Sequence, residues 1–177
     1  MDKSNIVIRK VETKDAKQYV ELINLVWRLT YKNIFPEEVF LDMENKNEER
    51  IKNFSNNFYN DNTRMCYVAE DDRKIVGVVY GTIKSTYEYF RNQRFADLIS
   101  LYVLPEYQNR GLGKRFKDVF VDWAKKNNVK KFVIGVLKDN KKARMIYEKW
   151  GGKLSLHEEP FYKLDFAYDE VFYTYDL

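Results

Sequence analysis

The sequence has few of the residues that most directly mark covalent or metal chemistry. Cys66 is the only cysteine and His157 the only histidine among 177 residues. A lone cysteine excludes an intramolecular disulfide and a multi-cysteine metal site, and it is typical of a reducing compartment. We therefore expect a cytoplasmic protein without a metal.

Long apolar runs are also missing. No segment approaches the roughly 18 apolar residues that a membrane-spanning helix needs, and residues 1–5 lead directly into a strand-like segment instead of a signal peptide. The chain contains only three prolines and shows no repeat or linker, while 45% of its residues are hydrophobic. These features predict one soluble domain over residues 1–177, with no membrane partner.

The charge balance does not favour nucleic acid as a partner. The formal net charge is only +4, and charges of both signs are mixed along the chain. The local cluster of Lys125, Lys126, Lys130 and Lys131 lacks interleaved aromatic residues, so it is best interpreted as the solvated ends of a surface helix. Residues 158–177 differ from the rest, because six acids and one lysine give them a local charge of −5.

Hydrophobic periodicity predicts strands that alternate with amphipathic helices. Gly77 and Gly81 are expected to mark a bulge. The expected elements are a strand at 6–9, a helix capped by Thr13 and carrying Ala16 to Trp27, a short helix beginning at Pro36, a helix carrying Ile51, Phe54 and Phe58, a hairpin of strands 65–69 and 75–83, a strand at 98–103, a helix opening at Gly113, a strand at 132–137, a helix carrying Ala143 to Trp150, and strands near 153–157 and 170–175.

The most informative segment runs from Val103 to Lys114, from an apolar strand through a glycine-bearing turn into an amphipathic helix. Gly111 and Gly113 permit backbone conformations that a Cβ would bar, and they let a ligand approach the main chain. The first turn of the helix offers unpaired amide donors and a partial positive charge. This pattern is typical of a phosphate-binding turn.

Two familiar glycine motifs do not fit the segment. A Walker loop needs four residues between its glycines and a Ser or Thr after the lysine, and a Rossmann fingerprint needs a third glycine where Phe116 stands. The remaining pattern, Gln108-x-x-Gly111-x-Gly113, resembles the acetyl-CoA-binding signature of the GCN5-related N-acetyltransferases (GNAT).

Two further segments resemble the same superfamily. Asp139 to Lys149, followed by two glycines, is similar to its second signature, and Trp27 to Pro36 is similar to the N-terminal helix pair of many bacterial members. The resemblance covers nearly the whole chain. It implies an α/β (α+β) fold in which helices flank both faces of a mixed, mostly antiparallel central sheet.

The resemblance also implies where acetyl-CoA would bind as co-substrate. The strand before the glycine turn would present backbone groups to the pantetheine arm and the thioester, the turn would surround the pyrophosphate, and Asn140 would contact the pantetheine. The implied cofactor-binding residues are Leu101, Tyr102, Val103, Gln108, Asn109, Arg110, Gly111, Leu112, Gly113, Lys114 and Asn140.

The implied catalytic residues are Tyr147 and Asp97. Tyr147 matches the position that protonates the departing CoA thiolate in many members, and the backbone amide of Val103 or a neighbour would stabilise the oxyanion. An alkyl ammonium with a pKa near ~10.4 must lose a proton before it attacks, so a base is required. Asp97 is the candidate base; Glu70 and Glu88 stay open as alternatives.

The two residues best suited to covalent catalysis lack supporting neighbours in the sequence. Cys66 stands in the middle of an apolar strand, where a cysteine usually acts as a small buried hydrophobe. His157 has no partnered serine or cysteine nearby. We therefore expect the amine to attack directly in a ternary complex, without an acyl-enzyme.

The acceptor is a primary amine whose identity the sequence leaves open. The acidic segment 158–177 favours a polyamine or another small cationic amine, and Tyr31 is the candidate substrate-binding residue. An amino acid, an antibiotic or a protein amine are the alternative acceptors, and a non-catalytic acyl-CoA-binding or regulatory module is the alternative to an enzyme. The family also suggests a homodimer.

Overall fold

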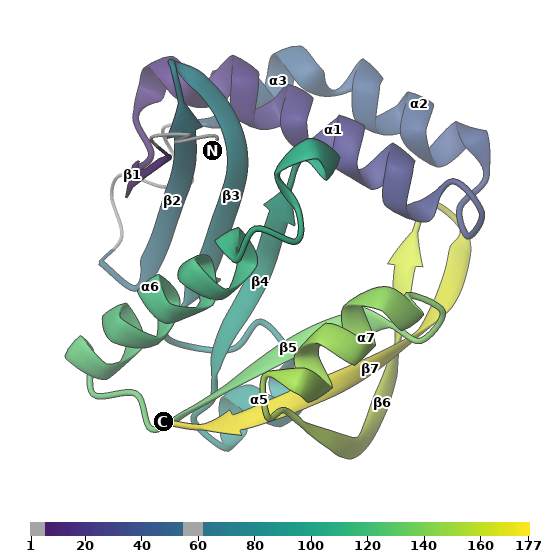
Figure 1. Ribbon diagram of the computed structural model, residues 1–177. Helices are drawn as coiled ribbons and strands as arrows, with labels where there is room; N and C mark the ends of the chain where they lie inside the picture. Colours follow the sequence, from purple (N-terminus) through teal and green to yellow (C-terminus); the bar gives the residue numbers. More distant parts are fainter. Residues whose placement is uncertain (1–5, 55–61) are drawn as a thin grey trace.

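The computed structural model describes residues 6–54 and 62–177 of the chain. In this part the strands form one seven-stranded sheet in the order β1-β2-β3-β4-β5-β7-β6 (Figure 1). Only β4 and β5 pair in parallel; the other neighbours are antiparallel. The elements are β1 (Val7–Lys10), η1 (Thr13–Asp15), α1 (Ala16–Tyr31), α2 (Glu37–Asn45), α3 (Asn47–Lys52), β2 (Arg64–Asp71), β3 (Lys74–Thr82), α5 (Glu88–Asn92), β4 (Ala96–Val103), η2 (Pro105–Tyr107), α6 (Leu112–Lys126), β5 (Lys131–Leu137), α7 (Lys141–Lys149), β6 (Lys153–Lys163) and β7 (Phe166–Asp176). The mixed, mostly antiparallel sheet expected from the sequence is confirmed. Phe58, which was expected to lie in the same helix as Ile51 and Phe54, is outside the described residues.

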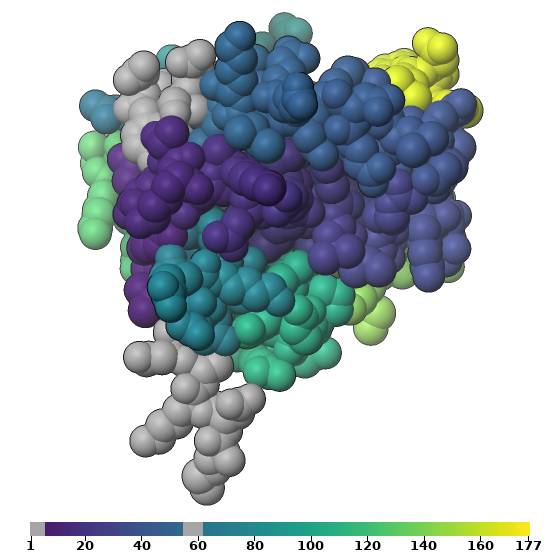
Figure 2. All heavy atoms as spheres, turned by 90° about the horizontal axis from the view of Figure 1, so that it is seen from above, coloured from purple at the N-terminus to yellow at the C-terminus, as the bar shows by residue number. Residues whose placement is uncertain are grey.

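Helices cover both faces of the sheet. α6 and α7 lie in front of it in Figure 1, while α1, α2 and α3 form a continuous layer in the view from above, which the end of the β6–β7 hairpin reaches (Figure 2). α5 lies on the face opposite α7, which is the face of α1, because its Phe90 packs against Phe172 of β7 while the next residue, Tyr173, contacts Tyr147 of α7. None of the described helices has the length and apolar character needed to cross a bilayer.

Glycines in β3 let α6 approach the sheet closely. The bulges expected near Gly77 and Gly81 are present, because the pairing register shifts beside each of them. A Cβ on Gly77 would lie 2.8 Å from the ring of Phe116, and one on Gly81 would be closer still to the ring of Phe120. These glycines therefore fix the distance between α6 and the strands that it covers.

The sheet opens between its two central strands. β4 and β5 pair only at Ala96 with Phe132 and at Asp97 with Val133, although β4 continues to Val103 and β5 to Leu137. β5 follows β7 along its whole length, while β4 follows β3. The two halves of the sheet therefore diverge beyond residue 97, which leaves a wedge between two strand edges.

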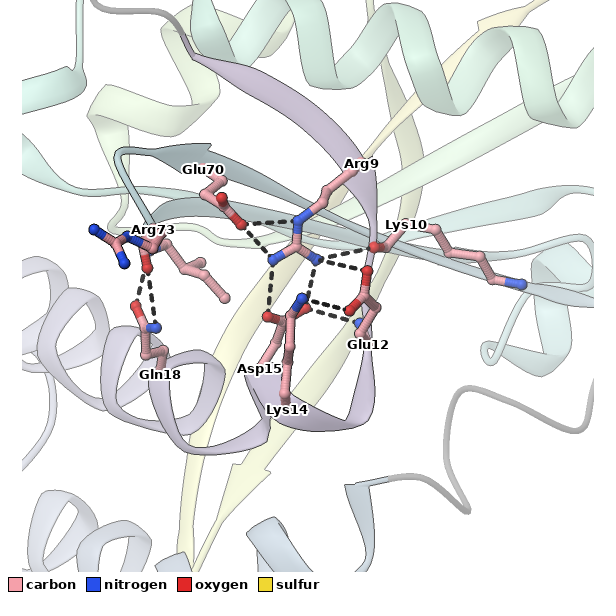
Figure 3. Close-up of polar contacts among 9 residues, drawn as sticks. Arg9, Lys10, Glu12, Lys14, Asp15, Gln18, Glu70 and Arg73 are labelled. Carbon is pink, nitrogen blue, oxygen red and sulfur yellow. Dashed lines mark hydrogen bonds and ion pairs between the residues drawn. The ribbon is translucent and has the colours of Figure 1, made fainter.

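A partly buried charge network, centred on the buried Asp15, closes the junction between β1 and α1 (Figure 3). Arg9 donates to both carboxylate oxygens of Asp15, at 2.7 and 2.9 Å, and to Glu70 on β2 at 2.9 Å. The Glu12 amide also donates to Asp15, at 2.8 Å. The prediction that Thr13 caps the helix is wrong: the chain enters through the turn η1, with Glu12 at the cap position and Asp15 accepting its amide proton.

Two further features differ from the sequence-based prediction. α5 was not expected, because a five-residue helix with one buried side chain, Phe90, has no detectable period. β6 and β7 are each eleven residues long, so most of the acidic segment is strand. Its charged residues and Pro160 are depleted in strands generally, but the free edge of the sheet tolerates them in β6.

We expect the substitution Asp15→Asn to destabilise the protein by about 1–3 kcal/mol at pH 7, because it removes the charged acceptor of Arg9. Burial alone would raise the pKa of Asp15, but the bonds from Arg9 and from the Glu12 amide lower it below its ordinary value. The stabilisation is therefore present above the unfolded pKa of about 3.9 and is lost as pH falls through the lower folded value. Urea unfolding at pH 7 and pH 3 measures the difference.

The matched control is Asp118→Asn, which removes an exposed ion pair with Lys114. This control should change stability by less than about 1 kcal/mol. Equal stability of Asp15→Asn and wild type at pH 7 would contradict the role of the network.

Candidate active site

The wedge between β4 and β5 forms a cleft of about 230 Å³. Its walls come from both halves of the sheet, from the turn before α6, and from the facing sides of α1 and α7. The lining residues are Val26, Thr30, Tyr31, Leu98, Ile99, Leu101, Tyr102, Val103, Gln108, Asn109, Gly113, Ile134, Gly135, Val136, Asn140, Lys142, Ala143, Ile146, Tyr147 and Trp150.

The glycine turn opens at one end of this cleft. Gly111 adopts a φ of +79°, which favours glycine, and it caps the fifteen-residue helix α6. Leu112 anchors the turn in the core, and a Cβ on Gly113 would lie 3.7 Å from both Leu101 and Trp150. The first amides of α6 have no acceptor earlier in the helix, so they can donate to an anion.

Side chains brace the turn against its neighbours. Gln108 donates to the carbonyl oxygen of Val103 at 2.9 Å and accepts from Lys142 on α7 at 2.8 Å. Arg110 lies over the ring of Tyr107 at 5.6 Å. The turn is thus linked to β4 and to α7, the two walls of the cleft.

Asn140 begins α7, because its side-chain oxygen accepts a hydrogen bond from the Ala143 amide at 3.1 Å. The residue lines the cleft as well. Tyr31, at the end of α1, also lines the cleft and is buried. Burial raises the pKa of Tyr31, an effect that the Asn140 side chain partly offsets.

Tyr147 projects from α7 into the cleft. Its carbonyl oxygen accepts from the Tyr175 hydroxyl at 2.8 Å, which ties α7 to β7, but its own hydroxyl makes no hydrogen bond within the described residues. Burial raises the pKa of Tyr147, and the nearby Tyr31 and Tyr175 raise it further. The phenol is therefore protonated at neutral pH, as a proton donor must be.

Asp97 is fully buried where β4 leaves β5, and it does not line the cleft. Its Oδ2 accepts from the Thr86 hydroxyl at 2.6 Å and from the Thr86 amide at 3.1 Å, whereas Oδ1 has no partner among the described residues. Burial raises the pKa of Asp97 to about 6. Of the two alternatives, Glu70 pairs with Arg9 at the β1–α1 junction and Glu88 is exposed on α5.

The structure also buries Glu170, which the sequence analysis counted among the six acids of residues 158–177. The Tyr87 hydroxyl donates to Glu170 at 3.0 Å, and both groups lie against Gly135, a cleft residue whose added Cβ would meet them at 2.5 and 2.7 Å. Burial raises the pKa of Glu170 to about 7. Buried aromatic and aliphatic neighbours along 171–175 were the signal that both faces of this strand are covered.

The cleft gathers most of the predicted site residues, but not all. Those that line it are Tyr31, Leu101, Tyr102, Val103, Gln108, Asn109, Gly113, Asn140 and Tyr147. Those outside its walls are Asp97, Arg110, Gly111, Leu112 and Lys114, the last of which pairs with Asp118 at 2.8 Å.

Cys66 and His157, which the sequence analysis rejected as covalent catalysts, also lie away from the cleft. Cys66 is buried in β2, where burial raises its thiol pKa to about 12. His157 stacks on Tyr89 with ring centroids 4.0 Å apart, and its Nε2 lies 2.9 Å from Glu159. The described residues contain no group of three or more His, Cys, Asp or Glu side chains arranged to hold a metal ion.

We expect Glu170→Gln to change how stability depends on pH. The folded state keeps the carboxyl proton up to about pH 7, compared with about 4.5 for the unfolded group, so wild-type stability should fall between these values as pH rises. Glutamine carries no charge and can still accept from Tyr87. The variant should therefore gain stability relative to wild type from pH 4.5 to 7.5, as measured by urea unfolding.

The control Glu158→Gln removes an exposed carboxylate that pairs with Lys138. The stability of this control relative to wild type should stay constant over the same pH range. Parallel stability curves for wild type and Glu170→Gln would contradict the assignment of a raised carboxyl pKa.

Comparison with known proteins agrees with this architecture. The model of the acetyltransferase (GNAT) family matches residues 21–152. The chain is similar to the crystal structure of PaiA N-acetyltransferase from Thermoplasma acidophilum in complex with coenzyme A, at 22% identity and a TM-score of 0.72, covering 96% of this chain and 99% of that one. No curated protein sequence matches the chain significantly.

Two further solved structures are similar over nearly their whole length. Ribosomal-protein-alanine N-acetyltransferase from Brucella melitensis has 19% identity and a TM-score of 0.68, covering 97% of this chain and 99% of that chain. YncA, a putative acetyltransferase from Salmonella typhimurium with its cofactor acetyl-CoA, has 18% identity and a TM-score of 0.66, covering 98% and 94%. Since the family model spans more than half of the sequence, the chain belongs to the acetyltransferase (GNAT) family.

Proposed function

We propose that this protein transfers the acetyl group of acetyl-CoA to a primary amine by direct attack in a ternary complex. The observation that carries the proposal is the cleft between β4 and β5, where the protonated hydroxyl of Tyr147 and the glycine turn before α6 share one space. Membership of the GNAT family supports acetyl transfer, and two of the similar structures contain coenzyme A or acetyl-CoA.

The residues of the wedge fit the acetyl donor. Beyond Asp97 the facing edges of β4 and β5 no longer pair with each other, so backbone groups along Leu98–Val103 are available to the amides of a pantetheine arm. The first amides of α6 suit a pyrophosphate, with Arg110 and Lys114 exposed nearby to add positive charge. When bound, acetyl-CoA supplies the thioester, whose C–S bond breaks as a C–N bond to the acceptor forms and CoA leaves as the free thiol.

Tyr147 is the proposed proton donor to the leaving sulfur. Its hydroxyl faces the cleft without a competing hydrogen bond from the described residues, and its raised pKa keeps the proton available. The backbone amide of Val103 or a neighbour is the proposed donor to the oxyanion. Tyr31, which also lines the cleft, is proposed to contact the acceptor.

The proposed base is one of two buried carboxylates. Asp97, our sequence-based candidate, does not reach the cleft directly, so it would act through water. Glu170 lies against Gly135 in the cleft wall, and its pKa of about 7 suits a group that accepts a proton near neutral pH. Either group must be ionised to accept a proton, so activity would rise with pH through the pKa of the base.

The polyamine acceptor suggested by the acidic segment has little support from the fold. Its carboxylates do not converge on the cleft: Glu158 pairs with Lys138, Glu159 with His157, and Asp176 with Lys153, while Glu170 is buried. Acetylation of a protein amine and a non-catalytic acyl-CoA-binding role are the alternatives. Acetyl-CoA-dependent thiol release over an amine panel separates transfer from binding alone.

We further propose that residues 1–177 act as one domain in the cytoplasm and that the protein forms a homodimer. Within the described residues the sheet has two edge strands, β1 and β6, and the proposed dimer would use β6, because β7 lies inside the sheet between β5 and β6. Leu154, Leu156 and Tyr162 are exposed along that strand.

We expect Tyr147→Phe to lower kcat by about 10²-fold or more, because the leaving thiolate loses its proton donor. The binding of acetyl-CoA, measured by calorimetry, should change by only a few fold, since phenylalanine preserves the packing against Trp150. Tyr162→Phe, at a residue that is 66% exposed, is the control and should keep wild-type turnover. Unchanged turnover in Tyr147→Phe would remove Tyr147 from the catalytic role.

A further inference from the structure

A second cavity, of about 310 Å³, lies on the α1 side of β4. It is bounded by α1, the α2–α3 corner, two β4 side chains and the end of β6. Tyr102 belongs to the walls of both this cavity and the cleft, and its hydroxyl accepts from Trp27 at 2.9 Å. The lining residues are Tyr19, Ile23, Trp27, Asp42, Met43, Lys46, Arg50, Ser100, Tyr102 and Lys163.

Arg50 is held in this cavity through one side of its guanidinium. Nη1 donates to the Asn24 side chain at 2.6 Å and to the Met43 carbonyl at 3.3 Å. Neither Nε nor Nη2 has a hydrogen-bond partner among the described residues, and no carboxylate there pairs with Arg50. The guanidinium is therefore held in place while its Nε–Nη2 edge keeps its hydrogen-bond donors available. A carboxylate or phosphate binds such an edge with two hydrogen bonds.

Lys163 enters the cavity from the end of β6. Its Nζ lies 5.1 Å from the ring centre of Trp27, and it forms no ion pair with any described residue. The β6–β7 hairpin is fixed here by aromatic packing, since Phe35 contacts Tyr168 at 4.6 Å between ring centroids and Phe161 at 6.4 Å. Burial lowers the pKa of Lys163, as it does that of Arg50.

The cavity has more positive than negative charge. Its lining includes three cations, Lys46, Arg50 and Lys163, and one acid, Asp42. Asp42 pairs with Lys46 at 2.8 Å, and its charge only partly offsets the lowering of the Lys163 pKa by burial, while neither Lys163 nor Arg50 forms an ion pair with a described residue. Partly buried cations without an acidic partner are costly, and a bound anion would offset that cost.

We propose that this cavity binds the anionic group of the acceptor, so that the acceptor is a small amine carrying a carboxylate or phosphate. The inference rests on the proposed transferase function and names its substrate class. Arg50 and Lys163 bind the anion, and the Ser100 hydroxyl lies in the same wall. The amine then extends past Tyr102, the residue shared with the cleft, toward Tyr147.

This placement disfavours polyamines, because a second cationic group would face Arg50 and Lys163. The cavity volume suits a small molecule and leaves the anion as the main point of recognition. The choice between acceptors should therefore depend on their charge more than on the shape of the rest of the molecule.

Matched acceptor pairs test the proposal. Thiol release is measured with glycine and glycinamide, β-alanine and its amide, phenylalanine and its amide, and phosphoethanolamine and ethanolamine, with spermidine as the polycation. In each pair one member carries the anion and the other lacks it. The first three pairs test a carboxylate, and the last pair tests a phosphate. At least one acceptor that carries an anion should exceed its partner without the anion by about tenfold or more in kcat/KM.

Two variants assign the effect to the cavity. Lys163→Gln and Arg50→Gln should each bring the ratio of kcat/KM between the anionic acceptor and its partner closer to unity, chiefly through a higher KM for the anionic acceptor. Lys163→Gln is the primary variant, because Arg50 also joins α1 to the α2–α3 corner and its loss threatens folding. Lys52→Gln removes an exposed charge from the same helix as Arg50 and should keep the wild-type discrimination.

A direct binding measurement makes the test independent of turnover. The Arg50 Nε–H signal in a ¹H–¹⁵N NMR spectrum is titrated with inorganic phosphate and with N-acetylglycine, in wild type and in Lys163→Gln. Saturable shifts that weaken in Lys163→Gln support the proposal, even if no acceptor in the panel is turned over. An unresponsive Arg50 signal overturns it.

The outcomes separate this inference from the proposed function. Turnover that favours ethanolamine, amides or spermidine, and that is unaffected by Lys163→Gln, overturns the anionic acceptor while leaving the transferase intact. Failure to bind acetyl-CoA by calorimetry overturns the transferase, and the phosphate titration then decides separately whether the cavity binds anions.

Discussion

The parallel contact between β4 and β5 is the constraint on which the rest of the molecule depends. Two residue pairs join these strands before they diverge, because β4 follows β3 and β5 follows β7. A fully paired sheet would leave no wedge and would satisfy the backbone groups along both edges. The short pairing holds the two halves together and at the same time opens the cleft that α6 and α7 border.

Buried charged groups have different kinds of partner in three regions of this protein. At the β1–α1 junction, Arg9 satisfies Asp15 and Glu70 within one network. Behind the cleft, Asp97 and Glu170 are buried with neutral donors, so burial raises their pKa values into the range useful for proton transfer. On the α1 side, Arg50 and Lys163 form no ion pair with a described residue, which is the reverse arrangement and the basis of the proposed anion site.

Local patterns in the sequence were sufficient for much of the fold and for part of the site. The glycine turn, the one-sided helices α6 and α7 and the hairpin of β2 and β3 follow from periodicity and turn chemistry. The start of α1 was misplaced because the choice between Thr13 and Glu12 depends on Arg9 and Asp15 meeting across a turn. The burial of Glu170 was not predicted, because it depends on Tyr87, 83 residues away.

The sequence by itself determined the family signatures, the order of most of the elements and the residues of the glycine turn, since these depend on neighbours within a few positions. Only the tertiary structure decided which side chains share a cavity. Asp97 and Tyr147 were predicted together, yet only Tyr147 lines the cleft. Arg50 and Lys163 carry no motif, yet they converge because β6 folds back onto α1 and α3. Burial and convergence arise from packing between distant segments, which no local pattern encodes.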